Sequence, residues 1–202
     1  MTFIRETIIT SCDAAGNVHV APMGATVTET GYALAPFRPS RTLDNLLATR
    51  CAVVNFTDDV RVFAGCVTGR RRDWPTVPAQ RIRGRVLAGA LAHEEVEVVM
   101  VEDDGQRPRL DCRPVHLATH RPFRGFNRAQ AAVVEGAILV SRLHLLPSEK
   151  IDREMEYLSI AIGKTAGPVE LEAWGWLLDR IADHRAGEHR AGEHRAGGDG
   201  AA

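Results

Sequence analysis

The stretch that decides the fold is residues 16–59, GNVHVAPMGATVTETGYALAPFRPSRTLDNLLATRCAVVNFTDD. It is typical of two strands, a short turn rich in Arg, Ser and Thr, a helix and one further strand. The turn, residues 38–42 (RPSRT), lies where a strand passes into a helix. Unpaired N–H groups and the positive end of the helix dipole make such a turn suited to a phosphate, and two arginines strengthen this. A solvent-exposed helix cap with incidental arginines is the alternative that the spacing leaves open.

The segments on either side of this stretch predict a β-barrel. A meander of three strands is expected first, at residues 5–12, 17–28 and 32–37. Residues 51–56 (CAVVNF) are almost wholly apolar, which is typical of a strand buried on both faces. Three more strands are expected at residues 84–92, 95–101 and 110–119. Six or seven antiparallel strands at short spacing, interrupted by small helices, indicate a closed or nearly closed barrel.

The chain becomes helical from Asn127 onward. Helices are expected over residues 128–145, over 148–163 and from Pro168, with apolar residues at helical spacing that should form inner faces. These residues are Val133, Ala137, Val140, Ile151, Met155, Leu158, Ile162, Leu171, Trp174, Leu178 and Ile181. We therefore expect a barrel domain at 1–122, a helical extension packed on it at 123–183, and a tail at 184–202. The tail holds three near-copies of HRAGE, is poor in apolar residues, and is predicted to be disordered.

Composition excludes several classes of protein. The chain has 25 basic and 26 acidic residues, and this balance argues against a general nucleic-acid binder. The run Arg70, Arg71 and Arg72 is interpreted as a solvated loop. Four scattered cysteines lack the spacing of a zinc site, and no segment is long and apolar enough for a signal peptide or membrane span. We expect a cytoplasmic protein without bound metal.

Two segments are candidates for ligand binding. At the helix start, polar groups converge in Arg38, Ser40, Arg41, Thr42 and, one helical turn later, Asn45. Inside a predicted strand, residues 20–24 (VAPMG) include a proline and a glycine, so the strand either bulges or is closely approached by something flat. A bulge without a ligand is the alternative reading of the second segment.

The helix after Asn127 carries one polar stripe. Arg128, Glu135 and Arg142 are spaced by seven residues and therefore lie on one side of it. The stripe indicates either a solvated face or the edge of a ligand pocket or subunit interface, and Asn127 and Arg128 are its candidates for ligand contact. The chain lacks GxSxG, HExxH, Walker and GxGxxG motifs, so catalytic residues cannot be named. This favours a bound organic cofactor that brings its own chemistry.

Four blocks carry a family resemblance, namely APMGA, LAPFRPSRTLDNL, VVNFTDD and FNRAQAAVVEGAILVSRL, in that order. Together they resemble an uncharacterised family of FMN-binding split-barrel proteins within the flavin reductase and pyridoxamine phosphate oxidase-like superfamily. Its members occur in methanogens and in bacteria with tetrahydromethanopterin-linked one-carbon enzymes. The similarity covers about residues 5–182. It implies an α+β fold: an antiparallel six-stranded split barrel with a C-terminal helical extension, forming a homodimer with FMN in a groove near the subunit interface.

The resemblance also implies roles for residues. Ser40, Arg41 and Thr42, with Arg38 before them, match the phosphate-binding turn of the superfamily. The flavin ring would lie near two segments, and Asn55 would hydrogen-bond the ring or the ribityl chain. The residues of these two segments are Pro22, Met23 and Gly24, and Pro36 and Phe37.

The lysine common in the oxidases is absent and their substrate-phosphate residues have no match, so pyridoxamine phosphate oxidation is not expected. The expected function is that of a flavin-dependent oxidoreductase of unknown substrate, with a small-molecule electron donor or acceptor and a link to one-carbon metabolism. The alternatives are a non-catalytic FMN carrier or redox sensor that acts through protein partners, and a ligand-free interaction module.

Overall fold

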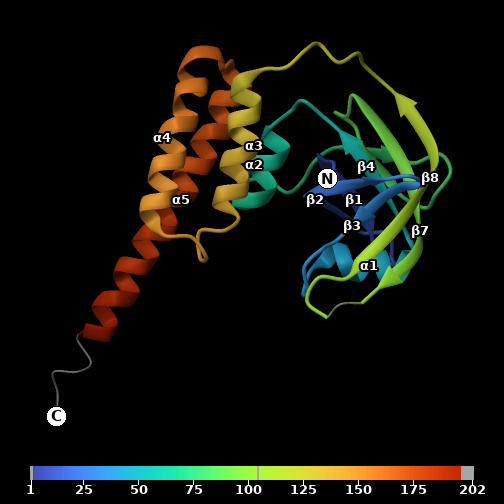
Figure 1. Ribbon diagram of the computed structural model, residues 1–202, viewed down its shortest axis with the longest axis horizontal. Coiled ribbons are helices and arrows are strands. Elements are labelled where there is room, and N and C mark those ends of the chain that lie inside the picture. The colour runs from blue at the N-terminus through green and yellow to red at the C-terminus, as the bar shows by residue number, and fades with distance from the viewer. Residues whose placement is uncertain (1, 104, 197–202) are drawn as a thin grey trace.

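The computed structural model describes residues 2–103 and 105–196, with side chains as far as residue 187. Six strands close into an antiparallel barrel in the order β1-β2-β3-β8-β7-β4 (Figure 1). Their bounds are β1 Ile4–Cys12, β2 Val18–Thr28, β3 Gly31–Leu34, β4 Cys51–Phe56, β7 Ala92–Glu102 and β8 Arg109–Thr119. The predicted barrel is therefore confirmed.

The segment expected to be a strand at 84–92 differs from the prediction. Only β6, Arg85–Leu87, is extended there, and it pairs with β5, Thr76–Pro78, in a separate two-stranded sheet. The chain then turns, because the N–H of Ala90 donates to the carbonyl of Leu87 at 3.0 Å. Residues 76–91 thus leave the barrel wall instead of joining it.

One stretch of the barrel wall has an open edge. β1 pairs with β2 from Val18 to Thr26 in one continuous register, whereas β3 pairs only with residues 26–28 of β2. Residues 18–25 of β2 therefore have β1 on one side and no strand of the described chain on the other.

Helix α1, Arg41–Thr49, contributes to the barrel core. Its Leu43 and Leu46 are buried in the same apolar cluster as Ile9, Leu34 and Val54 of the strands. The opposite face of the helix, with Arg41 and Asp44, is exposed to solvent. Packing of this amphipathic face, more than helix propensity, holds so short a helix.

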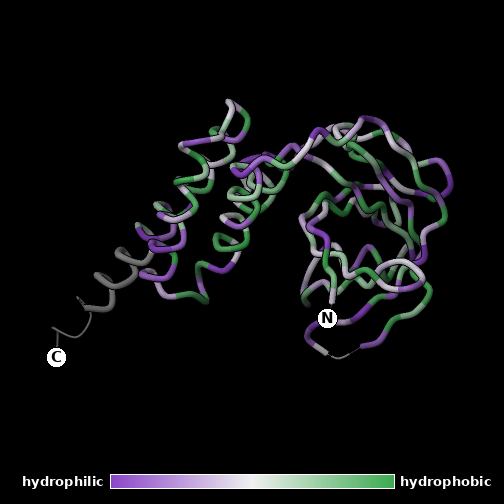
Figure 2. Tube along the Cα trace, turned by 45° about the horizontal axis from the view of Figure 1, so that its top comes forward, coloured by the Kyte–Doolittle hydropathy of each residue, from purple (hydrophilic) through white to green (hydrophobic). Residues whose placement is uncertain are grey.

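Four helices form a second layer beside the barrel. Their bounds are α2 Arg61–Thr68, α3 Arg128–Val140, α4 Ser148–Thr165 and α5 Pro168–Ala196. Figure 1 shows α3, α4 and α5 side by side with α2 between them and the strands. In Figure 2 hydrophobic and hydrophilic residues alternate along these helices, as amphipathic helices require. A second apolar cluster joins Ile8 and Val20 of the strands to Phe63, Val133 and Leu177 of the helices.

The inner face of α5 differs from the prediction. Leu171 and Leu178 are 53% and 46% exposed, whereas Leu177 is fully buried and Trp174 and Ile181 are buried as expected. The segment has two apolar stripes, and α5 is turned so that the stripe with Leu177 packs against α2 and α3. The prediction that Leu171 and Leu178 are core residues is wrong for this reason.

The ends of the helices also differ from the predictions. α3 ends at Val140 instead of residue 145, and α4 continues past Gly163 to Thr165. α5 extends through part of the predicted disordered tail to Ala196, which agrees with the high helix propensity of Ala, Arg and Glu in the repeats. Residues 197–202 of that tail lie outside the described residues. No described helix has the length and apolar character that a membrane crossing requires.

Candidate functional site: the α1 start and the open edge of β2

The first turn of α1 divides its polar residues between the barrel and the surface. Ser40 is the extended N-cap, and its Oγ accepts the N–H of Leu43 at 3.3 Å. Thr42 and Asn45 are each 3% exposed and point inward, and Asn45 Nδ2 donates to Ser11 Oγ at 3.0 Å. Arg41 is exposed. Of these four residues, Ser40 and Arg41 therefore present polar groups at the surface, while Asn45 ties α1 to β1.

Two residues outside the predicted site, His19 and Arg72, are linked electrostatically to Arg41. His19, half-buried at the beginning of β2, has a pKa below its usual value, first because of burial and then because of the positive charges of Arg41 and Arg72. Arg72 belongs to the loop after α2, which the sequence reading interpreted as solvated. The positive charges of Arg41 and Arg72, which come from two separate segments, thus both act on His19 of a third. No spacing signal could have found this group, since its members are more than 20 positions apart and meet only through the fold.

The open edge of β2 continues from His19 through Pro22, Met23 and Gly24. These three residues face Ile8, Thr7 and Glu6 of β1 without a register shift, so the bulge considered from the sequence is not present. The glycine at position 24 is explained without a ligand, because a Cβ there would lie 2.9 Å from Ile4 Cγ2. No described strand covers this edge, although the thiol of Cys66 on α2 donates to the Val20 carbonyl at 3.5 Å. The edge left for a flat ligand is therefore that of residues 21–24, which are half-buried.

The segment between β3 and α1 is held by the β7–β8 hairpin. The N–H of Arg38 donates to the carbonyl of Gln106 at 2.9 Å, and its guanidinium lies 3.2 Å from the Asp103 carboxylate. Arg107 lies over the Phe37 ring, 4.6 Å from its centroid. Pro36 is buried and Phe37 is 59% exposed. Because the Arg38 ion pair is exposed, it contributes little, and its guanidinium can exchange the carboxylate for another anion.

Asn55 lies apart from this group. It is fully buried, and its Nδ2 donates to the Ile8 carbonyl at 2.9 Å and to Thr10 Oγ1 at 3.1 Å. Its Oδ1 accepts the N–H of Leu87 at 2.8 Å. The amide is therefore engaged in joining β4 to β1 and β6, and the structure does not bring it to the α1 start.

Asn127 is likewise engaged within the protein. Its Oδ1 caps α3 by accepting the N–H groups of Ala129 and Gln130 at 2.8 and 3.1 Å. Its Nδ2 donates to the Thr165 carbonyl at 3.0 Å and so joins α3 to the end of α4. Arg128 beside it is exposed. Neither residue has a described contact with the α1 start.

The rest of the stripe on α3, Glu135 and Arg142, is exposed, and its charges reach Glu6 of β1. Burial raises the pKa of Glu6 on β1, the charge of Glu135 raises it further, and that of Arg142 lowers it. Glu6 lies directly across from Gly24 in the strand register. The exposure of Glu135 and Arg142 agrees with a solvated face, while their charge effect on Glu6 leaves the pocket edge as a prediction.

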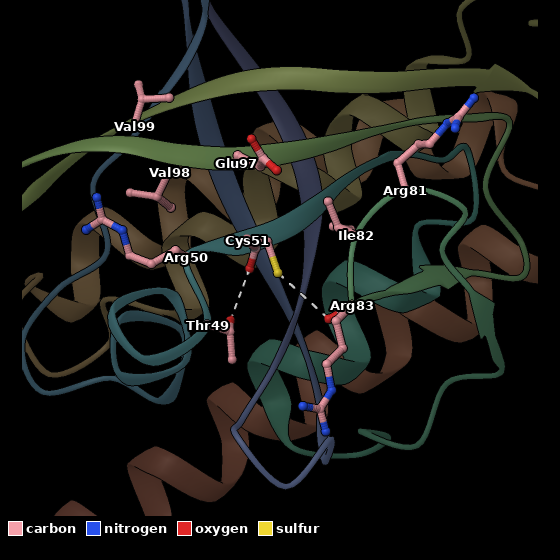
Figure 3. A pocket seen from close by; sticks show the side chains of 9 residues that line it. All are labelled: Thr49, Arg50, Cys51, Arg81, Ile82, Arg83, Glu97, Val98 and Val99. Atoms are coloured by element: carbon pink, nitrogen blue, oxygen red, sulfur yellow. Dashed lines mark hydrogen bonds between the residues drawn. The ribbon is translucent and has the colours of Figure 1, made fainter.

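A separate pocket of about 440 Å³ lies at the opposite end of α1. Figure 3 shows its lining from the end of α1, the start of β4, the 81–83 loop and β7. Its lining residues are Thr49, Arg50, Cys51, Arg81, Ile82, Arg83, Glu97, Val98 and Val99. Burial raises the pKa of Cys51, whose thiol donates to the Arg83 carbonyl at 3.7 Å. That thiol is therefore not an activated nucleophile, and the pocket contains none of the predicted site residues.

The six-stranded barrel with one open edge, its small helices and its helical layer together define a split-barrel fold with a C-terminal helical extension. Two family models match the chain: "Protein of unknown function (DUF447) N-terminal domain" over residues 5–121 and "Protein of unknown function (DUF447)" over 127–179. The chain belongs to this family. A search of curated proteins found no match.

Solved structures share this fold at low sequence identity. An FMN-bound protein of the same family from Methanosarcina mazei is 20% identical, with a TM-score of 0.76 over 88% of this chain and 94% of its own. The flavin reductase component of a bacterial two-component tryptophan halogenase is 16% identical, with a TM-score of 0.50 over 59% and 82%. A homologue of nitrilotriacetate monooxygenase component B from Mycobacterium thermoresistibile is 21% identical, with a TM-score of 0.50 over 61% and 73%.

Proposed function

We propose that this protein binds FMN, with the phosphate at the start of α1, and that it is a flavin-dependent oxidoreductase acting on a small molecule. The observation that carries the proposal is the capped start of α1 with its exposed Arg41, on a barrel in which residues 18–25 of β2 have one edge without a strand. The charges of Arg41 and Arg72, which act on His19, support it. The family resemblance to an FMN-bound protein supplies the identity of the phosphate compound.

The residues at the site fit this cofactor. A phosphate dianion would be held by Arg41 and Arg72, with Ser40 and the backbone N–H groups of the first turn, and would relieve the repulsion that lowers the pKa of His19. Arg38 is near enough in sequence to join them after releasing Asp103. The flat ring would lie against the backbone of β2 and of residues 36–37. When bound, FMN supplies hydride acceptance and donation, while the protein orients it.

A homodimer with the FMN near its interface is part of the same proposal. Several large apolar side chains of the barrel and linker are exposed, among them Phe3 at 61%, Leu117 at 62% and Phe126 at 100%. Exposed apolar surface on a soluble fold commonly marks an interface. The one-carbon, tetrahydromethanopterin-linked role is supported by the family resemblance, and the cytoplasmic location by the sequence features given above.

A non-catalytic FMN carrier or redox sensor is the second candidate. The helical layer favours it, because Tyr157 on α4 and Leu171 on α5 are 72% and 53% exposed and offer a surface to a protein partner. Such a protein would bind flavin without exchanging electrons with a nicotinamide.

Mass spectrometry of the ligand released from the purified protein tests the cofactor, and FMN is the expected mass. Anaerobic mixing with NADH or NADPH then separates the two candidates: bleaching of the bound flavin supports the oxidoreductase, and inertness with both donors supports the carrier. Arg41→Ala should weaken FMN binding. Arg50→Asn, at the other end of the same helix, is the matched control and should not, since Asn tolerates the left-handed backbone there (φ 56°). A protein that binds no FMN in titration contradicts the whole proposal.

A further inference from the structure

Two histidines and a glutamate meet on one face of strands β7 and β8. His93 and Glu95 are two residues apart on β7 and so point to the same face, and His116 lies directly across from Glu95 on β8. His93 is 1% and Glu95 0% exposed, while His116 is half-buried. One nitrogen or oxygen atom from each lies within 4.8 Å of the other two. This group could not be recognised from the sequence, since its members are separated by up to 23 positions and lack zinc-site spacing.

The hydrogen bonds around this cluster leave acceptors facing its centre. His93 Nδ1 lies 2.8 Å from Nε2 of His120, in nearly parallel rings. A proton on His93 Nδ1 satisfies that bond and leaves Nε2 with a lone pair. His93 Nε2 lies 3.5 Å from Glu95 Oε1, at the limit of hydrogen-bond distance, and Nε2 of His116 is buried without a partner among the described residues. An unpaired buried polar atom costs about 1–3 kcal/mol, and a cation bound by the two imidazole nitrogens and the carboxylate would remove that cost.

The carboxylate of Glu95 is fixed in place by backbone donors. Its Oε1 accepts the N–H of Gln80 at 2.6 Å, and its Oε2 accepts those of Arg81 and Ile82 at 2.7 and 3.0 Å. These bonds hold the group rigid and anionic, and Oε1 retains one lone pair, since a carboxylate offers about four acceptor sites. The loop over residues 80–82 therefore shields one side of the cluster.

We propose that His93 Nε2, His116 Nε2 and Glu95 Oε1 bind one divalent transition-metal ion of the zinc type. Metal–nitrogen and metal–oxygen bonds of about 2.0–2.2 Å place tetrahedral ligands roughly 3.4 Å apart, close to the 3.5 Å between His93 and Glu95. The half-buried ring of His116 turns inward to complete the set, and water takes the fourth position on its open side. His120 is a positioning residue, because it fixes the tautomer of His93. The ion joins the 80–82 loop to β7 and β8.

Metal titration of the full chain tests this proposal. All proteins carry Gln in place of the tail residues His184, His189 and His194, so that the tail cannot bind the ion. After removal of metal by a chelator, calorimetry with Zn²⁺ and absorption spectroscopy with Co²⁺ should both show one ion per chain. His116→Ala should lose at least 100-fold in affinity and His120→Ala about 10-fold, the latter as expected for a second-sphere partner. His144→Ala, at an exposed position beyond α3, is the matched control and should bind as the parent does.

Thermal unfolding gives a second measurement that does not depend on flavin. Zn²⁺ should raise the melting temperature of the parent and of His144→Ala, and leave that of His116→Ala unchanged. If His116→Ala does not fold, His116→Gln replaces it, since it keeps a polar side chain of similar reach. Absence of one-to-one binding in the parent, or equal binding by the His116 variant and the parent, overturns the proposal and assigns His93 and Glu95 to a metal-free polar pair.

Discussion

Replacement of Asn55 by alanine separates a structural role from a ligand contact. The side chain is fully buried, donates hydrogen bonds to the Ile8 carbonyl and Thr10 Oγ1, and accepts one from the Leu87 N–H. Truncation leaves the Leu87 N–H and the Ile8 carbonyl without this partner inside the protein. At roughly 1–3 kcal/mol for each, the free energy of unfolding should fall by about 2–6 kcal/mol. That is a large part of the ~5–15 kcal/mol that holds a domain of ordinary stability.

Urea unfolding of the flavin-free protein measures this loss, because a residue that contacts only a ligand would not affect it. Asn17→Ala is the matched control: Asn17 Nδ2 donates to Asp13 at 2.8 Å in an exposed turn, and its loss should cost under about 1 kcal/mol. If flavin-free Asn55→Ala is as stable as the parent while its affinity for FMN falls, the structural assignment of Asn55 is refuted and the sequence-based prediction of a cofactor contact stands.

Three further predictions concern the flavin site and its surroundings. Arg72→Ala should weaken FMN binding by about 10-fold or more, since a charge-assisted bond to phosphate contributes about 1.5–3 kcal/mol, and fluorescence titration would measure it; unchanged affinity would remove Arg72 from the site. Ser40→Ala should lower the free energy of unfolding by about 1 kcal/mol through loss of the α1 cap, whereas Ser40→Asp should restore it in urea melts. The pKa of Glu6 is raised above its usual 4.5, so the folded protein binds this proton more tightly and loses stability as the pH rises through that raised pKa. Glu6→Gln should accordingly be more stable than the parent at pH 7 and not below about pH 4.5, and equal melting curves at both pH values would contradict this assignment.

Local patterns in the sequence were sufficient for the barrel and for the start of α1. Alternation in β1 and β2, the apolar run of β4 and the hydroxyl before Arg41 each act over a few residues, so they can be recognised without knowledge of the fold. The four sequence blocks that carry the family resemblance added two expectations, a split barrel and bound FMN. The same local reasoning was wrong about Leu171 and Leu178, because α5 has two apolar stripes and only its packing against α2 and α3 selects between them.

The stretch at 16–59 thus determined by itself where a phosphate could sit, since an N-cap and its arginines are adjacent in the chain. Only the tertiary structure decided which distant charges act near it: α2 packs beside β2, and the charges of Arg41 and Arg72 both act on His19. It also decided that Asn55 holds strands together and that His93, Glu95 and His116 share one face. Strand register and helix packing set these neighbours, and both arise from contacts between residues far apart in the sequence, which no local periodicity records.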